Sequence, residues 1–410
     1  MGLSTLWFAL IAVLLTGYLI LEGFDFGVGM LTSILPRGDY VHKEKERRVL
    51  INTIGPVWDG NEVWILAAGG AIFAAFPEWY ATMFSGFYLP LLLILLALIV
   101  RAVSFEYRGR IESPGWRRAF DLCLSIGSWV PAFLWGVALA NLVRGLNLDG
   151  NHQYIGGFWA LLNPFAILGG LATVLLCLLH GATFVSLKTK GGVRRRAHKL
   201  ARQLALAALV VAGAWAIWAQ IAYGKLWTWI PVLVAALALI AIFLLLHRSI
   251  GSSGIDGTRV SSVPNASANS LRSADGIVYE EVLERDDGLA IESRHNEKLA
   301  FALSALIMAA VVALIFGSMY PYAIPGLRGG PGLLASAASS TPYTLRIMTI
   351  VALTLTPIVI AYQIWAYRVF RRRISTRDIP PSDGLSWKVL KGKAFGTPEE
   401  GYVTTYEVVE

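Results

Sequence analysis

Charge, cysteine and histidine are scarce in this sequence. Only 15% of its 410 residues are charged, whereas soluble domains have about a quarter, so a soluble globular fold is excluded. The two cysteines, Cys123 and Cys177, both fall inside apolar stretches, which excludes a disulfide framework and a paired-cysteine metal site. Glycine-rich dinucleotide turns, a phosphate-binding loop and a nucleophile elbow are also missing. We therefore predict no metal site and no redox-active catalytic residue in this chain.

Long apolar runs make up most of the remainder. Hydrophobic residues amount to 56% and the mean hydropathy is +0.58, and the apolar residues form runs of about twenty, the length at which a helix crosses a bilayer. The first run has no basic leader and no cleavage site, so we expect it to be retained as a span. The sequence predicts an all-α polytopic membrane protein of about nine transmembrane helices, arranged as two four-helix bundles plus one extra helix. The expected spans lie near residues 4–34, 50–75, 80–104, 118–143, 157–187, 201–222, 227–247, 298–319 and 343–369.

Basic residues are concentrated in alternate loops. The first, third and fifth loops and the segment after the last span are rich in lysine and arginine, whereas the intervening loops hold little more than Arg144, Lys225 and Arg328. Because basic side chains are retained on the cytoplasmic side, this asymmetry predicts an outside N-terminus and a cytoplasmic C-terminus. The net charge of +8 is spread over these loops rather than gathered on one patch, which argues against a nucleic-acid partner.

Two segments lack an apolar face. Residues 249–297 are rich in serine, glycine, asparagine and charge and are expected to form a flexible cytoplasmic loop, and residues 371–410 a cytoplasmic tail. The loop separates a first transmembrane part, 1–248, with seven helices from a second, 298–370, with two. A tolerated surface insertion explains the loop more simply than a regulatory role does.

Four carboxyl groups fall inside the first two spans. Glu22 and Asp25 are three residues apart, and so are Asp59 and Glu62, so each pair shares one helix face. Ionisable groups within a membrane are costly and mark functional sites, among them proton relays. Counting along the spans places Asp25 near the cytoplasmic interface and Asp59 near the middle of the membrane. The two pairs together have the arrangement of a proton entry route.

A structural role for these acids is the open alternative. Pairing with Arg101 or Arg108 would lock the helices together, and this interpretation is favoured for the two glutamates, while both interpretations stay open for the two aspartates. Glycines near the acids, including Gly27, Gly69 and Gly70, predict helices that approach closely.

Other polar and aromatic side chains fall at or inside the spans. His180 is well within a span, and a haem ligand is one interpretation, although a hydrogen-bonded structural histidine is the favoured one. Arg101 and Glu106 fall at the inner end of the third span, where a long charged side chain reaches the interface or a partner. Trp58 and Trp64 are interpreted as packing or interface aromatics.

Several short motifs are similar to those of one membrane-protein family. The stretch 22–29 (EGFDFGVG) and the heptapeptide 58–64 (WDGNEVW) closely resemble signatures of cytochrome bd-type quinol oxidase subunit II, and so do 180–182 (HGA) and 344–348 (TLRIM). They follow the family's order over almost the whole chain, and the heptapeptide is highly specific. The main departure from the family pattern is the insertion at 249–297.

The resemblance implies a partner and a shared reaction. In this family, subunit I binds all the haems, two of type b and one of type d, and subunit II packs against it as a similarly folded, haem-free mate. The complex oxidises quinol and reduces oxygen to water with protons taken from the cytoplasm, in the cell membrane of a prokaryote. Small accessory subunits, lipid and a structural quinone are further partners that the family allows.

The resemblance also implies roles for individual residues. Asp25 and Asp59, with Glu22 and Glu62, would lie on the proton route, and Trp64 would lie beside the membrane path for oxygen. The remaining motif residues would be structural or interface residues: Trp58, Asn61, Arg101, Glu106 and His180.

Two other functions stay open at this point. A proton-coupled secondary transporter would also have acids within its spans, although repeated halves and broken helices, which such proteins usually have, are not evident here. A purely structural assembly subunit would use every acid for packing.

Overall fold

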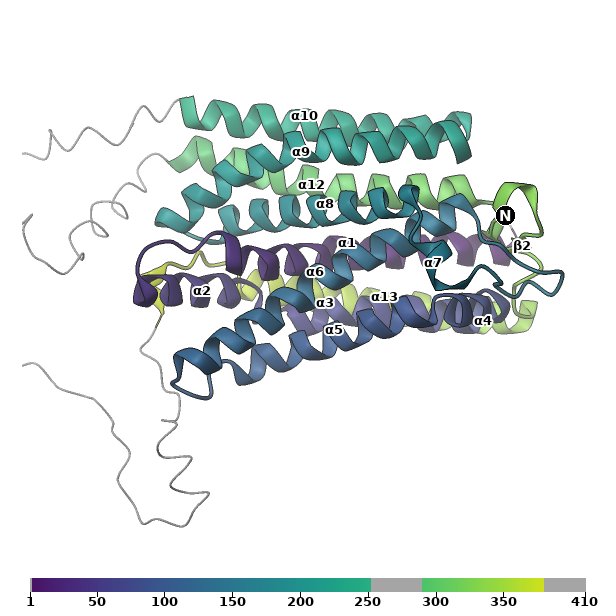
Figure 1. Cartoon of the computed structure of the whole chain (residues 1–410), viewed down its shortest axis with the longest axis horizontal. Helices are drawn as coiled ribbons and strands as arrows, with labels where there is room; N and C mark the ends of the chain where they lie inside the picture. The colour runs from purple at the N-terminus through teal and green to yellow at the C-terminus, as the bar shows by residue number, and fades with distance from the viewer. Residues whose placement is uncertain (1, 252–289, 380–410) are drawn as a thin grey trace, which may run out of the picture.

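Long helices run side by side along one axis of the molecule (Figure 1). The computed structural model describes residues 2–251 and 290–379. The helices are α1 (Leu3–Ile34), α2 (Tyr40–Ile54), α3 (Trp58–Ala75), α4 (Pro77–Gly86), α5 (Tyr88–Tyr107), α6 (Pro114–Arg144), α7 (Gly157–Leu161), α8 (Pro164–Lys188), α9 (Gly191–Tyr223), α10 (Trp229–Gly251), α12 (Ala290–Met319) and α13 (Pro342–Val369). Short 3-10 turns lie at Leu226–Thr228 (η1), Leu327–Gly329 (η4) and Thr376–Asp378 (η5), and strands β1 (Tyr322–Ile324) and β2 (Leu333–Leu334) form an antiparallel pair.

Local sequence determines where several of these helices begin. The side chains of Asp39, Asn163 and Thr341 each accept a hydrogen bond from the backbone N–H three residues further on, at the starts of α2, α8 and α13. Pro164 and Pro342 follow two of these caps, at a helical position whose N–H has no partner in the helix. The cap at Thr341 lies close to the expected start of the last span, whereas the caps at Asp39 and Asn163 start α2 and α8 at residues that the apolar pattern did not predict.

Within residues 2–251 and 290–379, eight helices are long and apolar enough to cross a membrane, which confirms an all-α polytopic membrane protein. The span expected at 50–75 is the exception, because the chain breaks after Ile54 and resumes as α3 at Trp58. Pro56, in the break, cannot continue a helix. The first turns of α3 also contain the polar residues Asp59, Asn61 and Glu62, and α3 is not among the described helices that meet the length and hydropathy of a span. One continuous ninth span was therefore a wrong prediction for this segment.

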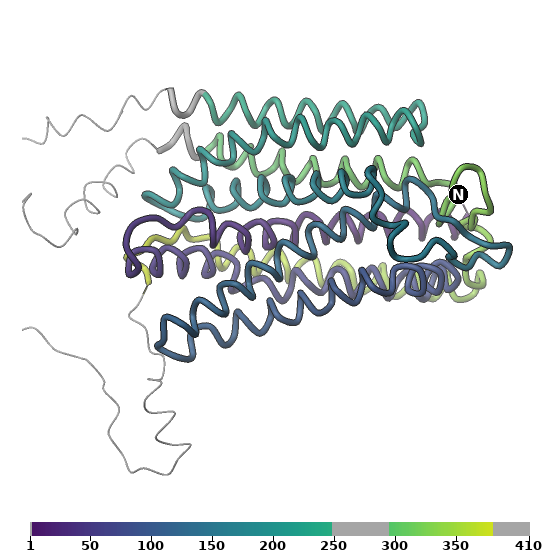
Figure 2. The backbone as a smooth tube through the Cα atoms, in the orientation of Figure 1, coloured from purple at the N-terminus to yellow at the C-terminus, as the bar shows by residue number. Residues whose placement is uncertain are grey.

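Leaving aside the shorter α2, α4 and α7, the described helices form two groups of four with one helix outside them. In the first group, α1 packs against α3 and α6, and α6 packs against α5; in the second, α9 packs between α8 and α10, and α12 packs against both α8 and α10. The two groups meet where α8 contacts α1 and α6. Figure 2 shows the same order across the molecule, with α10 at one edge and α5 at the other. Helix α13 packs mainly against α1 and α3, and Leu345 is its one buried residue.

Glycine allows the closest contact between the groups. A Cβ atom on Gly27 of α1 would lie 2.1 Å from the carbonyl oxygen of Cys177 in α8, and one on Gly181 would lie 2.6 Å from Cα of Gly27. The predicted close approach is thus confirmed at Gly27. For Gly69 and Gly70 the predicted close approach is wrong among the described residues, because an added Cβ would meet no atom within 4 Å.

The predicted cytoplasmic loop falls largely outside the described residues. Helix α10 extends to Gly251 and α12 begins at Ala290, so helix replaces the expected loop at both of its ends. Residues 252–289 and 380–410 are not described. The first part of the predicted tail is ordered, because Ile374 exchanges backbone hydrogen bonds with Lys188 and Lys190.

Candidate functional site

Helix α1 places two carboxyl groups in the interior of the first group. Glu22 and Asp25 are both fully buried. Glu22 forms an ion pair with Arg101 of α5, whose side chain is 1% exposed. The Arg101 guanidinium also lies 5.0 Å from the ring centre of Phe26 and 5.4 Å from that of Phe105, so aromatic faces cover the cation where carboxylates do not.

Asp25 is held by an amide from a second helix. Asn61 Nδ2 of α3 donates to Asp25 Oδ2 at 2.8 Å. Asn61 Oδ1 in turn accepts from Gln363 Nε2 and from the Tyr367 hydroxyl of α13, each at 2.8 Å. We call Glu22, Asp25, Asn61 and Arg101 the acid site. Helices α1, α3, α5 and α13 all meet at this site.

Two carboxyl oxygens of the acid site are unpartnered. Asp25 Oδ1 and Glu22 Oε2 are buried without a hydrogen-bond donor among the described residues. The site also contains two carboxyl groups and a single guanidinium, so one carboxyl group lacks a counter-charge. A buried carboxyl group without a counter-charge is a candidate for binding a proton, because this would leave the Glu22–Arg101 pair intact.

The second predicted acidic pair, Asp59 and Glu62, is less buried than Glu22 and Asp25. Asp59 is exposed in the first turn of α3 and accepts a hydrogen bond at 2.8 Å from the backbone N–H of Gly60. Glu62 is partly buried. Asp59 was expected about ten residues into an unbroken span and deeper than Asp25. In the structure Asp59 is in the first turn of α3, and Asn61, two residues further on, contacts Asp25. The expected step in depth between Asp25 and Asp59 is therefore wrong.

His180 has partners on both ring nitrogens. Nδ1 lies 2.6 Å from the Ser304 hydroxyl, and Nε2 donates to the carbonyl oxygen of Ile20 at 2.9 Å. Its ring stacks on Phe301 with the centres 4.8 Å apart. The side chain therefore does not fit an axial haem ligand and instead ties α8 to α1 and α12. Across residues 2–251 and 290–379, no three His, Cys, Asp or Glu side chains lie close enough together to hold a metal ion.

The remaining predicted residues surround the acid site. Trp64 packs over Gly17 of α1, where a Cβ atom would lie 2.4 Å from its ring. Trp58 stacks on Phe105, with the ring centres 4.8 Å apart. Glu106 is exposed at the end of α5.

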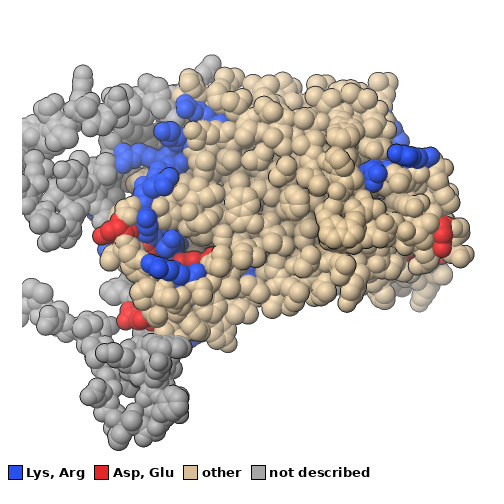
Figure 3. All heavy atoms as spheres, viewed as in Figure 1, with Lys and Arg blue, Asp and Glu red and all other residues tan. Residues whose placement is uncertain are grey.

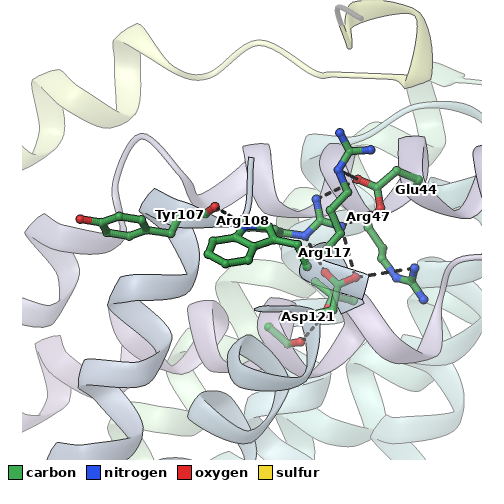
Figure 4. A network of polar contacts seen from close by, with 9 residues as sticks. Glu44, Arg47, Tyr107, Arg108, Arg117 and Asp121 are labelled. Carbon is green, nitrogen blue, oxygen red and sulfur yellow. Dashed lines mark hydrogen bonds and ion pairs between the residues drawn. The ribbon is translucent and has the colours of Figure 1, made fainter. Parts of the chain in front are cut away.

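A second ionic cluster lies at the end of the bundle where most lysines and arginines gather (Figure 3). Both terminal nitrogens of Arg108 donate to the Glu44 carboxylate, at 2.9 and 2.8 Å, and its Nε donates to Asp121 at 2.6 Å. Arg117 and Arg47 lie 3.7 Å from Glu44 and Asp121 respectively. We call these five residues the end network, and Figure 4 shows its three guanidinium groups directed at the two carboxylates.

The end network joins α2 to the ends of α5 and α6. Burial opposes the charge on Arg108, but hydrogen bonds from its guanidinium to Asp121 and Glu44 outweigh burial and raise the pKa of Arg108 above its usual value. Sequence reasoning assigned no role to Glu44 or Asp121. It also missed Gln363 and Tyr367, although their spacing of four residues on one helix face was a usable signal.

Comparison with known proteins identifies the family. The sequence matches the family described as "Cytochrome bd terminal oxidase subunit II" over residues 3–262 and 286–370. It is 37% identical over 382 residues to "Cytochrome bd ubiquinol oxidase subunit 2" of Bacillus subtilis (strain 168), covering 92% of this chain and 98% of the relative. The chain belongs to the cytochrome bd terminal oxidase subunit II family. A further relative, "Cytochrome bd-I ubiquinol oxidase subunit 2" of Escherichia coli (strain K12), is 35% identical over 387 residues, with 92% and 96% coverage.

The fold of this subunit II chain is similar to that of a solved bd oxidase. A chain from "The structure of bd oxidase from Geobacillus thermodenitrificans" superposes with a TM-score of 0.59, covering 90% of this chain and 99% of that one, at 17% identity. Family membership makes the chain one subunit of a membrane-bound, haem-containing terminal oxidase, and a second subunit implies a first.

One face of this subunit II is apolar and uncovered. Helix α13 is the extreme case, with Ile350 62%, Leu353 73% and Ile358 62% exposed, and Leu66 of α3 is 71% exposed. In a membrane such a surface meets either lipid or another subunit. The acid site lies directly beneath it, because Asn61 contacts α13 through Gln363 and Tyr367.

Proposed function

We propose that this chain is the haem-free subunit II of a quinol:oxygen oxidoreductase, that it packs on and stabilises haem-bearing subunit I, and that it supports reduction of oxygen to water with proton uptake from the cytoplasm. The observation that carries the proposal is a buried, cation-deficient acid site beneath an uncovered apolar face, in a chain of the subunit II family.

Proton uptake is assigned to the acids around Asp25. The uncompensated carboxyl group at Glu22 and Asp25 accepts a proton, and Tyr367 and Gln363 hold the Asn61 amide that positions Asp25. The exposed Asp59 and the partly buried Glu62 lie near the start of α3 and provide the approach to it. Trp64, packed on Gly17, would lie on the path that oxygen takes from the membrane.

The orientation follows from the distribution of basic residues. Most lysines and arginines lie at the α2 end of the bundle, and the N-terminus lies at the other end (Figures 1 and 3). Since basic loops stay in the cytoplasm, we place the α2 end there and the N-terminus outside, in the cell membrane of a prokaryote.

Both haems b and haem d are assigned to subunit I. The engagement of both His180 nitrogens within the chain supports a haem-free subunit II. A structural quinone and small accessory subunits remain compatible with the uncovered face.

An Asp25→Asn variant of the complex tests the proton role. Asparagine retains the size of the side chain and a carbonyl that Asn61 can bond, but it cannot release a proton. We expect quinol-driven oxygen consumption to fall about a hundredfold, the lower end of what a positioned proton-transfer group contributes, while the haem spectrum and subunit ratio stay unchanged. The matched control is Glu112→Gln, which removes an exposed carboxyl group just before the start of α6.

Full turnover in a haem-loaded Asp25→Asn complex would contradict the proton role but leave the subunit assignment intact. The assignment itself fails if a tagged chain purifies without a haem-containing partner.

A further inference from the structure

A basic cleft opens at the α2 end of the molecule, between the end of α8, the start of α12 and the segment that follows α13. Its volume is about 840 Å³. Six cationic side chains line it, and no aspartate or glutamate does: Lys188, Lys190, Lys298, Arg371, Arg372 and Arg373. We call this the basic cleft.

The positive charge of the basic cleft is only partly neutralised by the protein. Arg373 pairs with Glu297 at 2.6 Å, and Arg372 lies 3.5 Å from Asp378. Lys188 donates to the backbone carbonyl of Phe370, which brings no negative charge. Lys190, Lys298 and Arg371 have no carboxylate within 4 Å among the described residues. The cleft therefore has an excess of positive charge that favours an anion.

Apolar surface continues directly from the cations. Val369 and Phe370, at the end of α13, line the cleft and are 53% and 46% exposed, and Phe184 and Phe301 form part of its interior wall. The exposed apolar side of α13 extends from this point along the membrane span. A ligand that fits this surface has an anionic group at one end and long apolar chains at the other.

We propose that the basic cleft binds the headgroup of an anionic phospholipid, with its phosphodiester among the cations and its acyl chains along α13. Basic pockets between transmembrane helices at the membrane surface recognise such headgroups, and long basic side chains reach the phosphate while their stems stay in apolar surroundings. This inference depends only on the chain being a membrane protein and not on the oxidase function proposed above.

The bound lipid strengthens the attachment of α13 to the rest of the subunit. Helix α13 has a single buried residue, whereas the cleft joins its end to α8 and α12 of the second helix group. Tyr367, which lines the cleft, donates its hydroxyl hydrogen to Asn61 at 2.8 Å. The lipid therefore holds α13, and with it one wall of the acid site, in place.

The test compares lipids in nanodiscs that contain the purified complex. We expect phosphatidylglycerol to raise the melting temperature by about 3–5 °C relative to phosphatidylcholine, as a ligand specific to the folded state does. A Lys298→Gln/Arg371→Gln variant should lose at least half of this difference while melting like the wild type in phosphatidylcholine. Arg346→Gln removes the same kind of charge from the opposite end of α13 and should retain the full difference.

Three outcomes would overturn the proposal. Equal melting temperatures in the two lipids, or a full lipid effect in the double variant, would show that the cleft does not select anionic lipid. The same rise with inorganic phosphate in phosphatidylcholine discs would indicate a site for a soluble anion. A lipid effect that appears only after removal of residues 380–410 would show that the chain's own acidic tail occupies the cleft.

Discussion

The acid site and the end network both pair arginine with carboxyl groups, but carboxyl groups outnumber arginines in the first and arginines outnumber carboxyl groups in the second. In the acid site, two carboxyl groups share one arginine, and the paired side chains of Glu22 and Arg101 are 0% and 1% exposed. In the end network, three arginines surround two carboxylates, and Asp121 and Arg47 are 15% and 23% exposed. The acid site therefore has fewer cations than carboxyl groups in a dry interior, whereas in the end network each carboxylate lies beside two guanidinium groups nearer to water.

We expect the end network and the acid site to differ in function as well as in their depth in the protein. The end network joins α2 to α5 and α6 with ordinary charged hydrogen bonds, and its loss should affect stability alone. The acid site holds helices together and, in the function proposed above, also contains the group that takes up a proton. Substitutions should therefore separate stability from turnover in one region and not in the other.

The largest effect is expected for Arg101→Gln. Removal of one member of a buried ion pair leaves Glu22 without a counter-charge, which costs about 3–5 kcal/mol. We expect little folded complex, measured as the yield of the monodisperse peak in size-exclusion chromatography. The double variant Glu22→Gln/Arg101→Gln removes both charges and should restore much of the yield. If Arg101→Gln alone assembles normally, the ion pair does not hold α1 to α5.

Gly27→Ala should be the next most damaging change, because it disturbs the packing beside the acid site rather than its charge. A methyl group there would overlap the backbone of α8, and forcing such a contact costs about 3 kcal/mol. A clear drop in the melting temperature of the complex is expected. Gly70→Ala, with no atom within 4 Å of the added carbon in the described chain, is the matched control for folding of the subunit. Equal loss in both variants would mean that helix propensity, and not the α1–α8 contact, is responsible.

Arg108→Gln should have a moderate effect and sharpen the contrast with Arg101. It removes four charged hydrogen bonds to Glu44 and Asp121, and a loss of about 2 kcal/mol is expected, with haem content and turnover unchanged. Because the end network is closer to water, 1 M KCl should reduce the difference between wild type and variant. An effect on turnover larger than the effect on stability would contradict a purely structural network.

The pH dependence of the same variant follows from the raised pKa of Arg108. A basic group with a raised folded-state pKa stabilises the fold below its unfolded pKa and loses this contribution only as the pH rises through the folded value. Both values lie above the usual range of measurement. The stability difference between wild type and Arg108→Gln should therefore stay constant from about pH 7 to 11, and a difference that disappears in this interval would contradict the assignment.

Tyr367→Phe should have the smallest effect. It removes one of the two hydrogen bonds on Asn61 Oδ1 and leaves the one from Gln363, at a cost of about 1 kcal/mol. A small fall in turnover with nearly unchanged stability would indicate that the Asn61 amide must be held firmly to position Asp25. Gln363→Leu, which removes the other bond, should behave alike, and loss of assembly in either would point instead to a packing role for α13.

Several features of this protein follow from the sequence alone. The membrane location and helical class depend on runs of apolar residues, which are local and need no knowledge of neighbours. The motifs around Asp25 and between Trp58 and Trp64 were sufficient to indicate the family, which the comparisons confirm. Eight of the nine expected spans correspond to helices of sufficient length and hydropathy.

Only the tertiary structure decided which charges meet. Glu22 could have paired with either Arg101 or Arg108, and the choice depends on how α1 and α5 are aligned, which no local pattern records. Asn61 reaches Asp25 only because the chain breaks at Pro56 and α3 then packs along α1. The six cations of the basic cleft come from three separate segments, so their common surface arises when α8, α12 and the end of α13 are brought together in space.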